Sequence, residues 1–301
     1  MKKVYLNDPM DPAAVERLKK RVELTESTVC PEELDAIIVR QQYCPGELIR
    51  RAKKLRLIQQ HGVGLDRIDT RAARECGVQV RNTPGSNSRS VAEYALAMML
   101  DLSRKVTETD RKTRAGRLTS FGMEETVGFE MTGKRLGLIG SGHAALELAQ
   151  ICRDGFRMEV CCYSRSRSAE ELISLGLVPM GLHELFSNCD YVSVHCLLTP
   201  ENYRIVDAAC FENCRPGLIL VNTARGGLVD EGALYEALKE KKLAAAGLDV
   251  FESEPPDTGL PLFTLDNFLA GMHVAGSTRE ALRRGGEAVV NSVFEALGIE
   301  E

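Results

Sequence analysis

Short runs of branched, apolar residues alternate with polar-faced helical stretches along the chain, and this alternation limits the fold more than any other feature of the sequence. In the first third, the runs that are typical of strands are Val4–Leu6, Ala36–Val39, Leu55–Ile58 and Val78–Val80. Helical stretches such as Pro12–Lys20 and Pro45–Lys53 lie between them, and each begins with a proline, which suits a first helical turn. This alternation predicts a parallel, doubly wound α/β sheet.

A second alternating series follows a longer helix, which is predicted from about Ser90 to Arg114. This helix opens with Ser90-Val91-Ala92-Glu93, the spacing of a capping box. The segment 115–134 has no clear period, and we interpret it as a connecting arm. The strands predicted after it are Arg135–Ile139, Met158–Tyr163, Tyr191–His195, Leu218–Asn222, Ala245–Val250 and Phe268–Ala270. A last helix is predicted over Thr278–Leu297.

The two alternating series, bridged by the long helix, predict two α/β domains with a cleft between them. The length of 301 residues agrees with about two domains. The net charge of −5 and the even spread of Lys and Arg make nucleic acid an unexpected partner. No stretch approaches the ~18 apolar residues that span a bilayer, and the amino terminus does not have the pattern of a signal peptide. The ten cysteines are scattered without a Cys-x-x-Cys pair, so we expect neither disulfides nor a metal site. Cysteines without disulfides are typical of a reducing compartment, so we expect the protein to be located in the cytoplasm.

A glycine-rich turn follows the predicted strand Arg135–Ile139 and opens the predicted helix His143–Cys152. Gly140 and Gly142 stand where a dinucleotide site needs a tight turn and a close approach of backbone to pyrophosphate, and Ala145 takes the third position of the fingerprint. The amino terminus of the helix would supply N–H groups to the phosphates. The setting between strand and helix favours a dinucleotide site over a simple glycine turn.

The end of the next predicted strand indicates the cofactor. An NAD site needs a carboxylate about 20 residues past the glycines, to bind the ribose 2′-hydroxyl. Here the strand Met158–Tyr163 runs into Ser164-Arg165-Ser166-Arg167, and no acid appears until Glu170. Guanidinium and hydroxyl groups suit a 2′-phosphate, so we expect NADP. A solvated basic loop is the alternative, and NAD would then be the cofactor.

Three later stretches carry unusual polar groups at the ends of predicted strands. They are Asn222-Thr223-Ala224-Arg225-Gly226-Gly227, the run from Gly247 to Pro255, and His273-Val274-Ala275-Gly276-Ser277-Thr278. In an open α/β sheet, ligands bind outside the carboxyl ends of the strands. Arg, Glu and His side chains that are distant in the sequence can therefore meet in one site.

Together with Gly62-Val63-Gly64-Leu65-Asp66 and Asn82-Thr83-Pro84-Gly85, these stretches resemble the D-isomer-specific 2-hydroxyacid dehydrogenase family, over nearly the whole chain and in the same order. That family includes phosphoglycerate dehydrogenase and glyoxylate/hydroxypyruvate reductase. The resemblance implies a flavodoxin-like substrate domain, residues 1–96 with 278–301, and a Rossmann cofactor domain, residues 97–277. It also implies hydride transfer between NADP(H) and a small D-2-hydroxy or 2-oxo acid.

By this resemblance, three residues should be catalytic. Arg225 should bind the substrate carboxylate and polarise the carbonyl, because a guanidinium is rigid and always charged. His273 should be the acid/base, and Glu254 should hold it in position and favour its protonated form. Glu252 competes with Glu254 as the histidine partner, but the family pattern places the functional acid directly before proline, which selects Glu254.

The resemblance further implies the residues that contact substrate and cofactor. The backbone amides of Val63 and Gly64 should meet the substrate carboxylate, alongside Arg225 and His273. Asp249 should contact the nicotinamide carboxamide. The full set expected at the cofactor is Gly140, Gly142, His143, Ala144, Ser164, Arg165, Arg167, Thr199, Thr223, Asp249, His273 and Ala275.

The remaining histidines are expected to have no catalytic role. His195 is interpreted as a structural residue or one at the edge of the cofactor site, and His183 as a residue on a helix surface. His61 and His143 border the substrate loop and the phosphate loop respectively, and both are interpreted as neighbours of the site.

The sequence departs from the family pattern in the cofactor-lining segments. Leu197 and Met272 stand where proline is usual, and Ala144-Ala145 replaces Ile-Gly. Phosphoglycerate dehydrogenases hold the substrate phosphate with arginines; here Arg40 matches one such position, but Gln60 stands at another. The chain ends at Glu301, without the regulatory extension that many of those enzymes carry. Together with the basic loop 164–167, these differences favour an NADP-linked glyoxylate or hydroxypyruvate reductase.

Two other functions stay open. Within the enzyme class, the alternative is an NAD-dependent phosphoglycerate dehydrogenase or another D-2-hydroxyacid dehydrogenase. Outside it, a dinucleotide-sensing, corepressor-like binding protein would share the fold and the three catalytic residues. The resemblance also implies a homodimer that forms through the cofactor domains and uses the arm 115–134.

Overall fold

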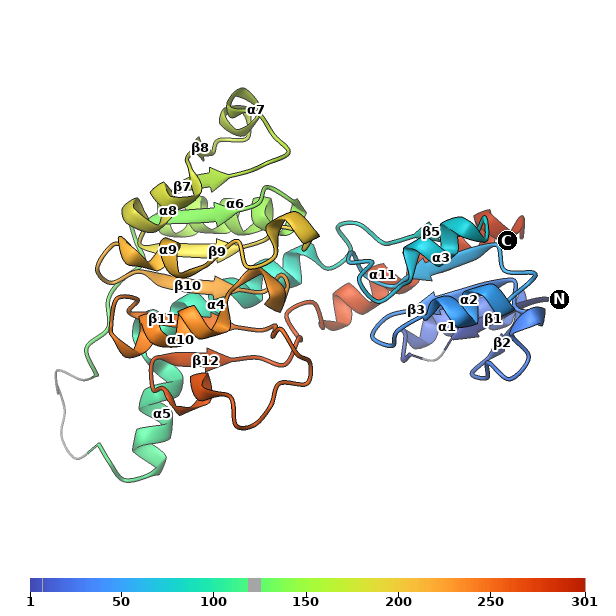
Figure 1. The fold of residues 1–301 in the computed structure, drawn as a ribbon, viewed down its shortest axis with the longest axis horizontal. Coiled ribbons are helices and arrows are strands. Elements are labelled where there is room, and N and C mark those ends of the chain that lie inside the picture. The colour runs from blue at the N-terminus through green and yellow to red at the C-terminus, as the bar shows by residue number, and fades with distance from the viewer. Residues whose placement is uncertain (7, 119–125, 301) are drawn as a thin grey trace. The chain divides into compact units, whose positions relative to one another are not determined.

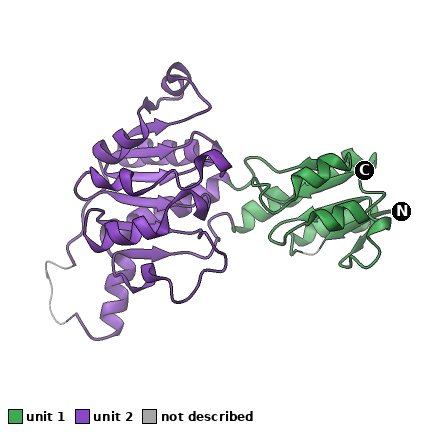
Figure 2. Ribbon diagram, viewed as in Figure 1, with its two compact units in different colours: residues 1–87, 277–301 green, residues 88–276 purple. Residues whose placement is uncertain are grey.

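The computed structural model describes residues 1–6, 8–118 and 126–300. Its internal contacts divide the chain into two units (Figure 2). Unit 1 comprises residues 1–87 and 277–301, and unit 2 comprises residues 88–276. The first boundary therefore falls before helix α4 (Ser88–Arg104) and not after residue 96, because this helix packs on α6, β10 and β11 of unit 2.

Unit 1 contains a parallel sheet of five strands among the residues that the structure describes (Figure 1). The spatial order is β2-β1-β3-β4-β5, which is the order of a flavodoxin-like sheet. The strands are β1 (Lys2–Leu6), β2 (Val22–Thr25), β3 (Ala36–Val39), β4 (Leu57–Gln60) and β5 (Gln79–Arg81). All of these except the edge strand β2 are predicted by the sequence pattern.

Helices cover both faces of this sheet. They are α1 (Pro12–Lys19), α2 (Gly46–Arg51), α3 (Thr70–Glu75) and α11 (Arg279–Leu297), with a 3-10 turn η1 (Pro31–Glu33). Alternate residues of β4 enter different cores: Leu57 packs with residues of α1 and α11, and Ile58 with residues of α2 and α3. Thr278 caps α11, since its hydroxyl accepts a hydrogen bond from the Ala281 amide. The carboxyl-terminal helix thus completes the amino-terminal unit.

Unit 2 contains a parallel sheet of seven strands in the described part of the chain, in the order β12-β11-β10-β9-β6-β7-β8. The strands are β6 (Arg135–Ile139), β7 (Glu159–Tyr163), β8 (Val178–Pro179), β9 (Tyr191–Val194), β10 (Ile219–Asn222), β11 (Ala245–Leu248) and β12 (Phe268–Ala270). The strand order reverses between β6 and β9, and such a switch point is where doubly wound sheets bind nucleotides.

Helices again lie on both faces of the seven-stranded sheet, so the predicted fold class of two doubly wound domains is confirmed. Residues of α4 and α6 (His143–Phe156) form the core on one face. Residues of α8 (Leu182–Asn188), α9 (Ala208–Glu212) and α10 (Glu231–Lys239) form the core on the other. The remaining elements are α5 (Val106–Arg114), α7 (Ala169–Ser174), η3 (Pro200–Asn202), η4 (Gly226–Leu228) and η5 (Pro261–Thr264).

The helix predicted from Ser90 to Arg114 differs from the observed structure in two ways. It begins at Ser88, so Ser90 lies inside the first turn, and Glu93 pairs with Arg89. It also ends at Arg104, because Lys105 adopts the left-handed conformation (φ 54°) and separates α4 from α5. Part of the arm 115–134, residues 119–125, lies outside the described residues. Within the described ranges, no helix combines the length and the hydropathy that crossing a lipid bilayer requires.

The register of the large sheet brings the carboxyl ends of its strands level with one another. Asn222 of β10 pairs with Val194 of β9 and Leu248 of β11, and Ile139 of β6 also pairs with Val194. The segments that follow these strands therefore emerge at one edge of the sheet. These are the segments that carry the predicted cofactor-binding and catalytic residues of unit 2.

Candidate active site

The turn between β6 and α6 requires glycine at its first position. Gly140 has φ +103°, and a Cβ atom there would lie 2.8 Å from the Cys196 amide nitrogen and 2.9 Å from the His195 carbonyl oxygen. The turn that follows β6 thus packs against the end of β9, the neighbouring strand across the switch point. Ala145 is fully buried in the core beneath α6, where the third position of the fingerprint needs a small side chain.

Gly142 differs, since no described protein atom requires a glycine there. Its φ is −74°, and the nearest atom to an added Cβ is the His195 oxygen at 3.8 Å. It is the N-cap of α6 and has no side chain to cap the helix. Within the part of the chain that the structure describes, the first amides of α6 therefore have no capping acceptor and are available to an anion. Among the described residues, the buried Thr223 hydroxyl oxygen also has no hydrogen-bond partner. Both features fit a bound dinucleotide.

Hydroxyl groups line the end of β7. Ser164 Oγ lies 3.0 Å from Ser141 Oγ, in the glycine turn, and 3.4 Å from Ser166 Oγ. Arg165 and Arg167 are exposed, and neither forms an ion pair with a carboxylate in the part of the chain that the structure describes. Both guanidinium groups thus belong to the loop whose hydroxyls reach the glycine turn.

Asn222 organises the turn that presents Arg225. Its side-chain oxygen accepts a hydrogen bond from the Ala224 amide (2.9 Å), and its side-chain nitrogen donates to the Arg225 carbonyl (2.8 Å). Gly226 then passes so close to the next segment that a Cβ would lie 1.9 Å from the Phe251 carbonyl carbon. Asn222 was not among the predicted site residues, although one amide in an otherwise apolar strand is a signal of a buried hydrogen-bonding site.

Asp249, fully buried after β11, holds the segment that carries His273. Its carboxylate accepts hydrogen bonds from the Val274 amide (3.0 Å) and the Ala275 amide (2.8 Å), and its carbonyl accepts one from the His273 amide (2.6 Å). These bonds hold His273 in the left-handed region, at φ 54°, which residues with a side chain rarely occupy. Burial raises the pKa of Asp249, and the two amide donors act against that rise. Tyr94 lies beside this carboxylate, and its pKa is raised by burial and by the Asp249 charge.

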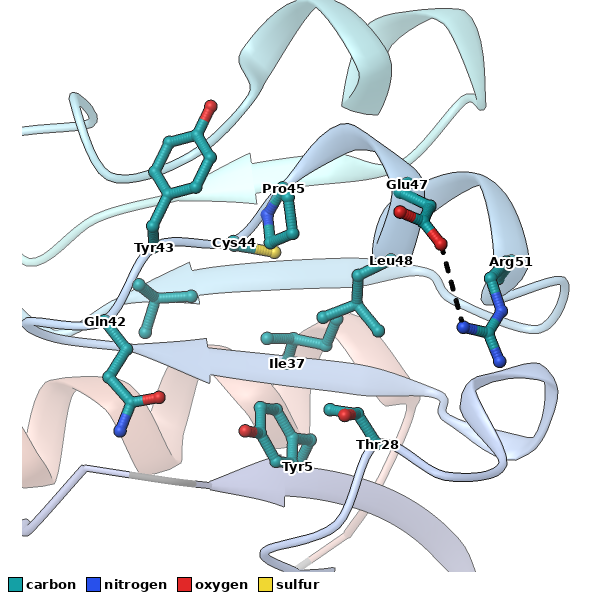
Figure 3. Close-up of a pocket in the computed structure, with 11 residues that line it drawn as sticks. Tyr5, Thr28, Ile37, Gln42, Tyr43, Cys44, Pro45, Glu47, Leu48 and Arg51 are labelled. Carbon is teal, nitrogen blue, oxygen red and sulfur yellow. Dashed lines mark ion pairs between the residues drawn. The ribbon is translucent and has the colours of Figure 1, made fainter.

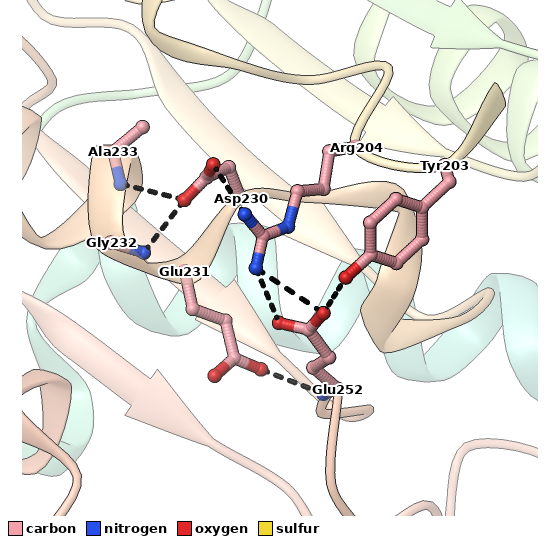
Figure 4. Close-up of polar contacts among 7 residues, drawn as sticks. All are labelled: Tyr203, Arg204, Asp230, Glu231, Gly232, Ala233 and Glu252. Atoms are coloured by element: carbon pink, nitrogen blue, oxygen red, sulfur yellow. Dashed lines mark hydrogen bonds and ion pairs between the residues drawn. The ribbon is translucent and has the colours of Figure 1, made fainter.

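His273 and Glu254 meet as a pair. His273 Nδ1 lies 2.9 Å from Glu254 Oε2, and the Phe251 amide donates to Glu254 Oε1 at 3.3 Å. Because a carboxylate only accepts, Nδ1 carries the proton of this bond and Nε2 is left for other partners. Glu252, the competing acid, is bound instead to Tyr203 and Arg204 (Figure 4).

Two of the other histidines are neutral at pH 7 because their rings have lost most of their hydration. Burial lowers the pKa of His195 to about 4, and its Nε2 lies 2.8 Å from Ser193 Oγ. Burial and the Arg40 charge lower the pKa of His61 to about 4. Without a charge near neutral pH, neither ring is suited to donate a proton to a substrate there. His183 is exposed on α8, and His143 is exposed at the start of α6.

Val63 and Gly64 belong to unit 1, in the loop after β4. Asn82 Nδ2 donates to the Val63 carbonyl at 2.7 Å, and the Gly62 amide donates to Thr83 Oγ1 at 3.0 Å. Among the described residues, no hydrogen bond is formed by the Val63 or Gly64 amide. These two amides are thus available to a ligand.

A separate pocket of about 280 Å³ lies in unit 1, beside β1, β3 and the start of α2 (Figure 3). Its wall includes Tyr5, Ile37 and Leu48, and the ion pair of Glu47 with Arg51 stands at one end. None of the residues predicted to bind substrate or cofactor lines it. We therefore assign this pocket no part in the site.

Gly142→Ala is expected to keep the thermal unfolding midpoint within about 2 °C of the wild type, since the backbone and space allow alanine. The added Cβ would stand where backbone approaches the pyrophosphate, so the affinity for NADPH and NADH should fall at least about tenfold. Isothermal titration calorimetry measures both affinities. Gly155→Ala, further along α6 and without neighbours within 4 Å, is the matched control. Unchanged affinity in Gly142→Ala would exclude this turn as the phosphate site.

Known proteins match this chain over nearly its whole length. Residues 96–275 match the family model described as D-isomer specific 2-hydroxyacid dehydrogenase, NAD binding domain. The chain is 36% identical to a hydroxypyruvate reductase from Thermotoga maritima, over 99% of both chains. A solved structure from Thermus thermophilus superimposes with a TM-score of 0.90 at 32% identity, covering 99% of this chain and 98% of that one.

A D-3-phosphoglycerate dehydrogenase from Archaeoglobus fulgidus is 38% identical over 97% of this chain. The match covers only 56% of that relative, so the chain spans about half the length of such a protein. The family model and the full-length match to the Thermotoga relative agree with each other. The chain belongs to the D-isomer specific 2-hydroxyacid dehydrogenase family.

Proposed function

We propose that this chain is an oxidoreductase that transfers a hydride between NADP(H) and a small D-2-hydroxy or 2-oxo acid, with glyoxylate or hydroxypyruvate as the oxo acid. The proposal rests mainly on the pair of His273 and Glu254, whose Nδ1 and Oε2 atoms lie 2.9 Å apart. The pair follows the carboxyl ends of strands in a doubly wound sheet, which is where such sheets bind nucleotides. A histidine whose ring is hydrogen-bonded to a carboxylate is suited to act as a general acid and base, donating a proton in one direction of the reaction and accepting it in the other.

In the proposed reduction, a nicotinamide cofactor, when bound, would supply the hydride that the carbonyl carbon of the oxo acid accepts. His273 Nε2 gives a proton to the carbonyl oxygen, and Glu254 keeps the ring oriented through Nδ1. Arg225 binds the substrate carboxylate and polarises the carbonyl. The Val63 and Gly64 amides, which have no described partner, bind the same carboxylate. The oxidation of the hydroxy acid reverses these steps.

The preference for NADP rests on the groups that follow β7. Ser164, Arg165, Ser166 and Arg167 offer hydroxyls and guanidinium groups, whereas binding of the NAD ribose needs a carboxylate. The other predicted contacts of the cofactor, which include His143, Ala144, Thr199, Thr223 and Asp249, stay part of the proposal. Thr223 keeps a buried hydroxyl without a described partner.

An unphosphorylated acid fits unit 1 better than a phosphorylated one. Gln60 is buried and neutral, and its side-chain nitrogen already donates to the Arg40 carbonyl at 3.1 Å. The Arg40 guanidinium donates to the Pro9 carbonyl and to Ser277 Oγ, at 3.3 and 3.4 Å. A single arginine is a weak site for a dianionic phosphate. The 38% identity to a phosphoglycerate dehydrogenase nevertheless keeps that enzyme, with NAD, as the second candidate.

Steady-state assays with NADPH and NADH against glyoxylate, hydroxypyruvate, pyruvate and 3-phosphohydroxypyruvate test this function. We expect the fastest turnover with NADPH and an unphosphorylated acid. His273→Gln should lower kcat by about 10²–10⁴-fold, because the proton donor acts in the chemical step. The affinity for NADPH should change little, and His183→Gln, at an exposed histidine, is the matched control.

Each other outcome of these assays discards a stated part of the proposal. Preference for 3-phosphohydroxypyruvate with NADH would select the phosphoglycerate dehydrogenase. Absence of turnover with every acid would select the dinucleotide-sensing binding protein. A loss of NADPH affinity in His273→Gln, with kcat unchanged, would remove His273 from its assigned role.

Replacing Arg165 and Arg167 together with alanine should raise the KM for NADPH by about 10²-fold, because two charge-assisted contacts to the 2′-phosphate are lost. The KM for NADH should change less than about threefold. Arg153→Ala removes an exposed cation from α6 and serves as the control. Equal losses for both cofactors would show that this loop does not bind the 2′-phosphate.

We further propose a homodimer that forms through the segment 115–134. Two apolar residues in its described part, Val127 and Phe129, have exposed fractions of 62% and 37% in the single chain. Exposed apolar side chains that lie close together are a feature of protein–protein contact surfaces. Light scattering coupled to size-exclusion chromatography should give twice the chain mass. Val127→Asp should shift that mass toward the monomer, whereas Val178→Asp, at an exposed valine of the edge strand β8, should not. A monomeric wild type would contradict the proposal.

A further inference from the structure

Arg204, just after η3, has a backbone conformation that costs strain. Its φ is +53°, in the left-handed region that residues with a side chain rarely occupy. A hydrogen bond from its amide to the Gly227 carbonyl, at 2.7 Å, contributes to holding this conformation. Strain of this kind persists where surrounding contacts maintain it, and it can mark a residue with a specific task.

The Arg204 guanidinium joins two segments that are distant in the sequence (Figure 4). One nitrogen lies 3.2 Å from an Asp230 carboxylate oxygen, and the other lies 3.2 and 3.3 Å from the two Glu252 oxygens. Tyr203 also donates a hydrogen bond to Glu252, and the Glu252 amide donates to Glu231 at 2.7 Å. Glu252 is therefore held through both its side chain and its backbone.

Both of these segments carry proposed catalytic residues. Asp230 follows the turn that presents Arg225, and its other oxygen caps α10 through the Gly232 and Ala233 amides, both at 3.0 Å. Glu252 stands two residues before Glu254, in a turn closed by the bond from the Phe251 amide to Glu254 Oε1. Any rotation of the Glu252 turn would therefore move the carboxylate that contacts His273.

The Arg204 guanidinium offsets the negative charge of a cluster of carboxylates. Asp230, Glu231 and Glu252 bring three carboxylates together where two segments meet, and Arg204 bonds to two of them. Without its guanidinium, repulsion among the carboxylates would favour separation of the two segments. The pair is partly exposed (44% for Arg204 and 34% for Glu252), so we expect it to affect placement more than overall stability.

We propose that Arg204 is a positioning residue for the reaction: by holding Glu252, it sets the place of Glu254 and therefore the orientation of the His273 ring. This inference rests on the proposed function for its kinetic consequence. Its structural consequence, the orientation of one histidine ring, does not depend on turnover.

The first test therefore measures the ring directly. In protein with ¹⁵N-labelled histidine, the five rings are expected to give five pairs of ring-nitrogen signals, one pair from each ring, and His273→Gln assigns the pair of His273. Arg204→Gly and Glu252→Gln should both move the His273 ring-nitrogen signals in the direction produced by Glu254→Gln, and leave the other four pairs unchanged. Glu252→Gln keeps the shape of the side chain, so it preserves the test if Arg204→Gly folds poorly. Unmoved His273 signals in both variants would overturn the proposal.

The second test is kinetic and uses the dependence on Glu254. Arg204→Gly should lower kcat about tenfold with NADPH affinity unchanged, since a small misplacement of a catalytic group costs rate and not cofactor binding. In a Glu254→Gln background, the same substitution should lower kcat less than about twofold, because the group it positions is already absent. The kcat of Arg204→Lys should lie between those of Arg204→Gly and the wild type, because lysine keeps the positive charge. An equal fold-loss in both backgrounds would overturn the proposal.

Lys241→Gly controls for the backbone, because Lys241 is exposed and also has a positive φ, 58°. Glycine relaxes the strain at both positions, but only Arg204→Gly removes a link to Glu252. Lys241→Gly should therefore keep the wild-type kcat and His273 signals. If the wild type turns over no oxo acid, the proposed function fails, whereas the ring signals still decide the role of Arg204.

Discussion

Two buried polar side chains at the ends of neighbouring strands hold the loops of unit 2 in place. Asn222 on β10 bonds to the Ala224 amide and the Arg225 carbonyl, and Asp249 after β11 bonds to the Val274 and Ala275 amides. Both side chains are fully buried, and an unpaired buried polar group costs about 1–3 kcal/mol. A loop that moved away would leave such a group unpaired, so these hydrogen bonds stabilise the observed conformation of the loops.

These hydrogen bonds hold the segments of the proposed catalytic residues through backbone groups, so they do not use the side chains of those residues. Asp249 uses both carboxylate oxygens and its carbonyl on the segment 273–275, and this leaves the His273 side chain projecting beside Glu254. His195, which the sequence also places at a strand end, lies against Ser193, and its pKa of about 4 makes it neutral at pH 7. Loss of hydration thus distinguishes two histidines that look alike in the sequence.

Much of the fold and part of the site can be predicted from the sequence, because both depend on local pattern. Parallel strands are short and apolar, so their cores are recognisable, and polar residues directly after them mark the ligand-binding edge. The choice of Glu254 over Glu252 comes from the family pattern, and in the structure Glu254 lies against His273. The edge strands β2 and β8 escape prediction, since a short, half-exposed strand has little apolar signal.

The remaining features depend on contacts that no local pattern records. Lys105 breaks a helix whose periodicity runs through it, and α4 belongs wholly to unit 2 because of what it packs on. Arg204 looks like any surface arginine in the sequence. Its meaning comes from a left-handed backbone and from carboxylates 26 and 48 residues away, at Asp230 and Glu252. Residues that position others are defined by such long-range geometry, so they are found only once the strand ends and loops have been placed.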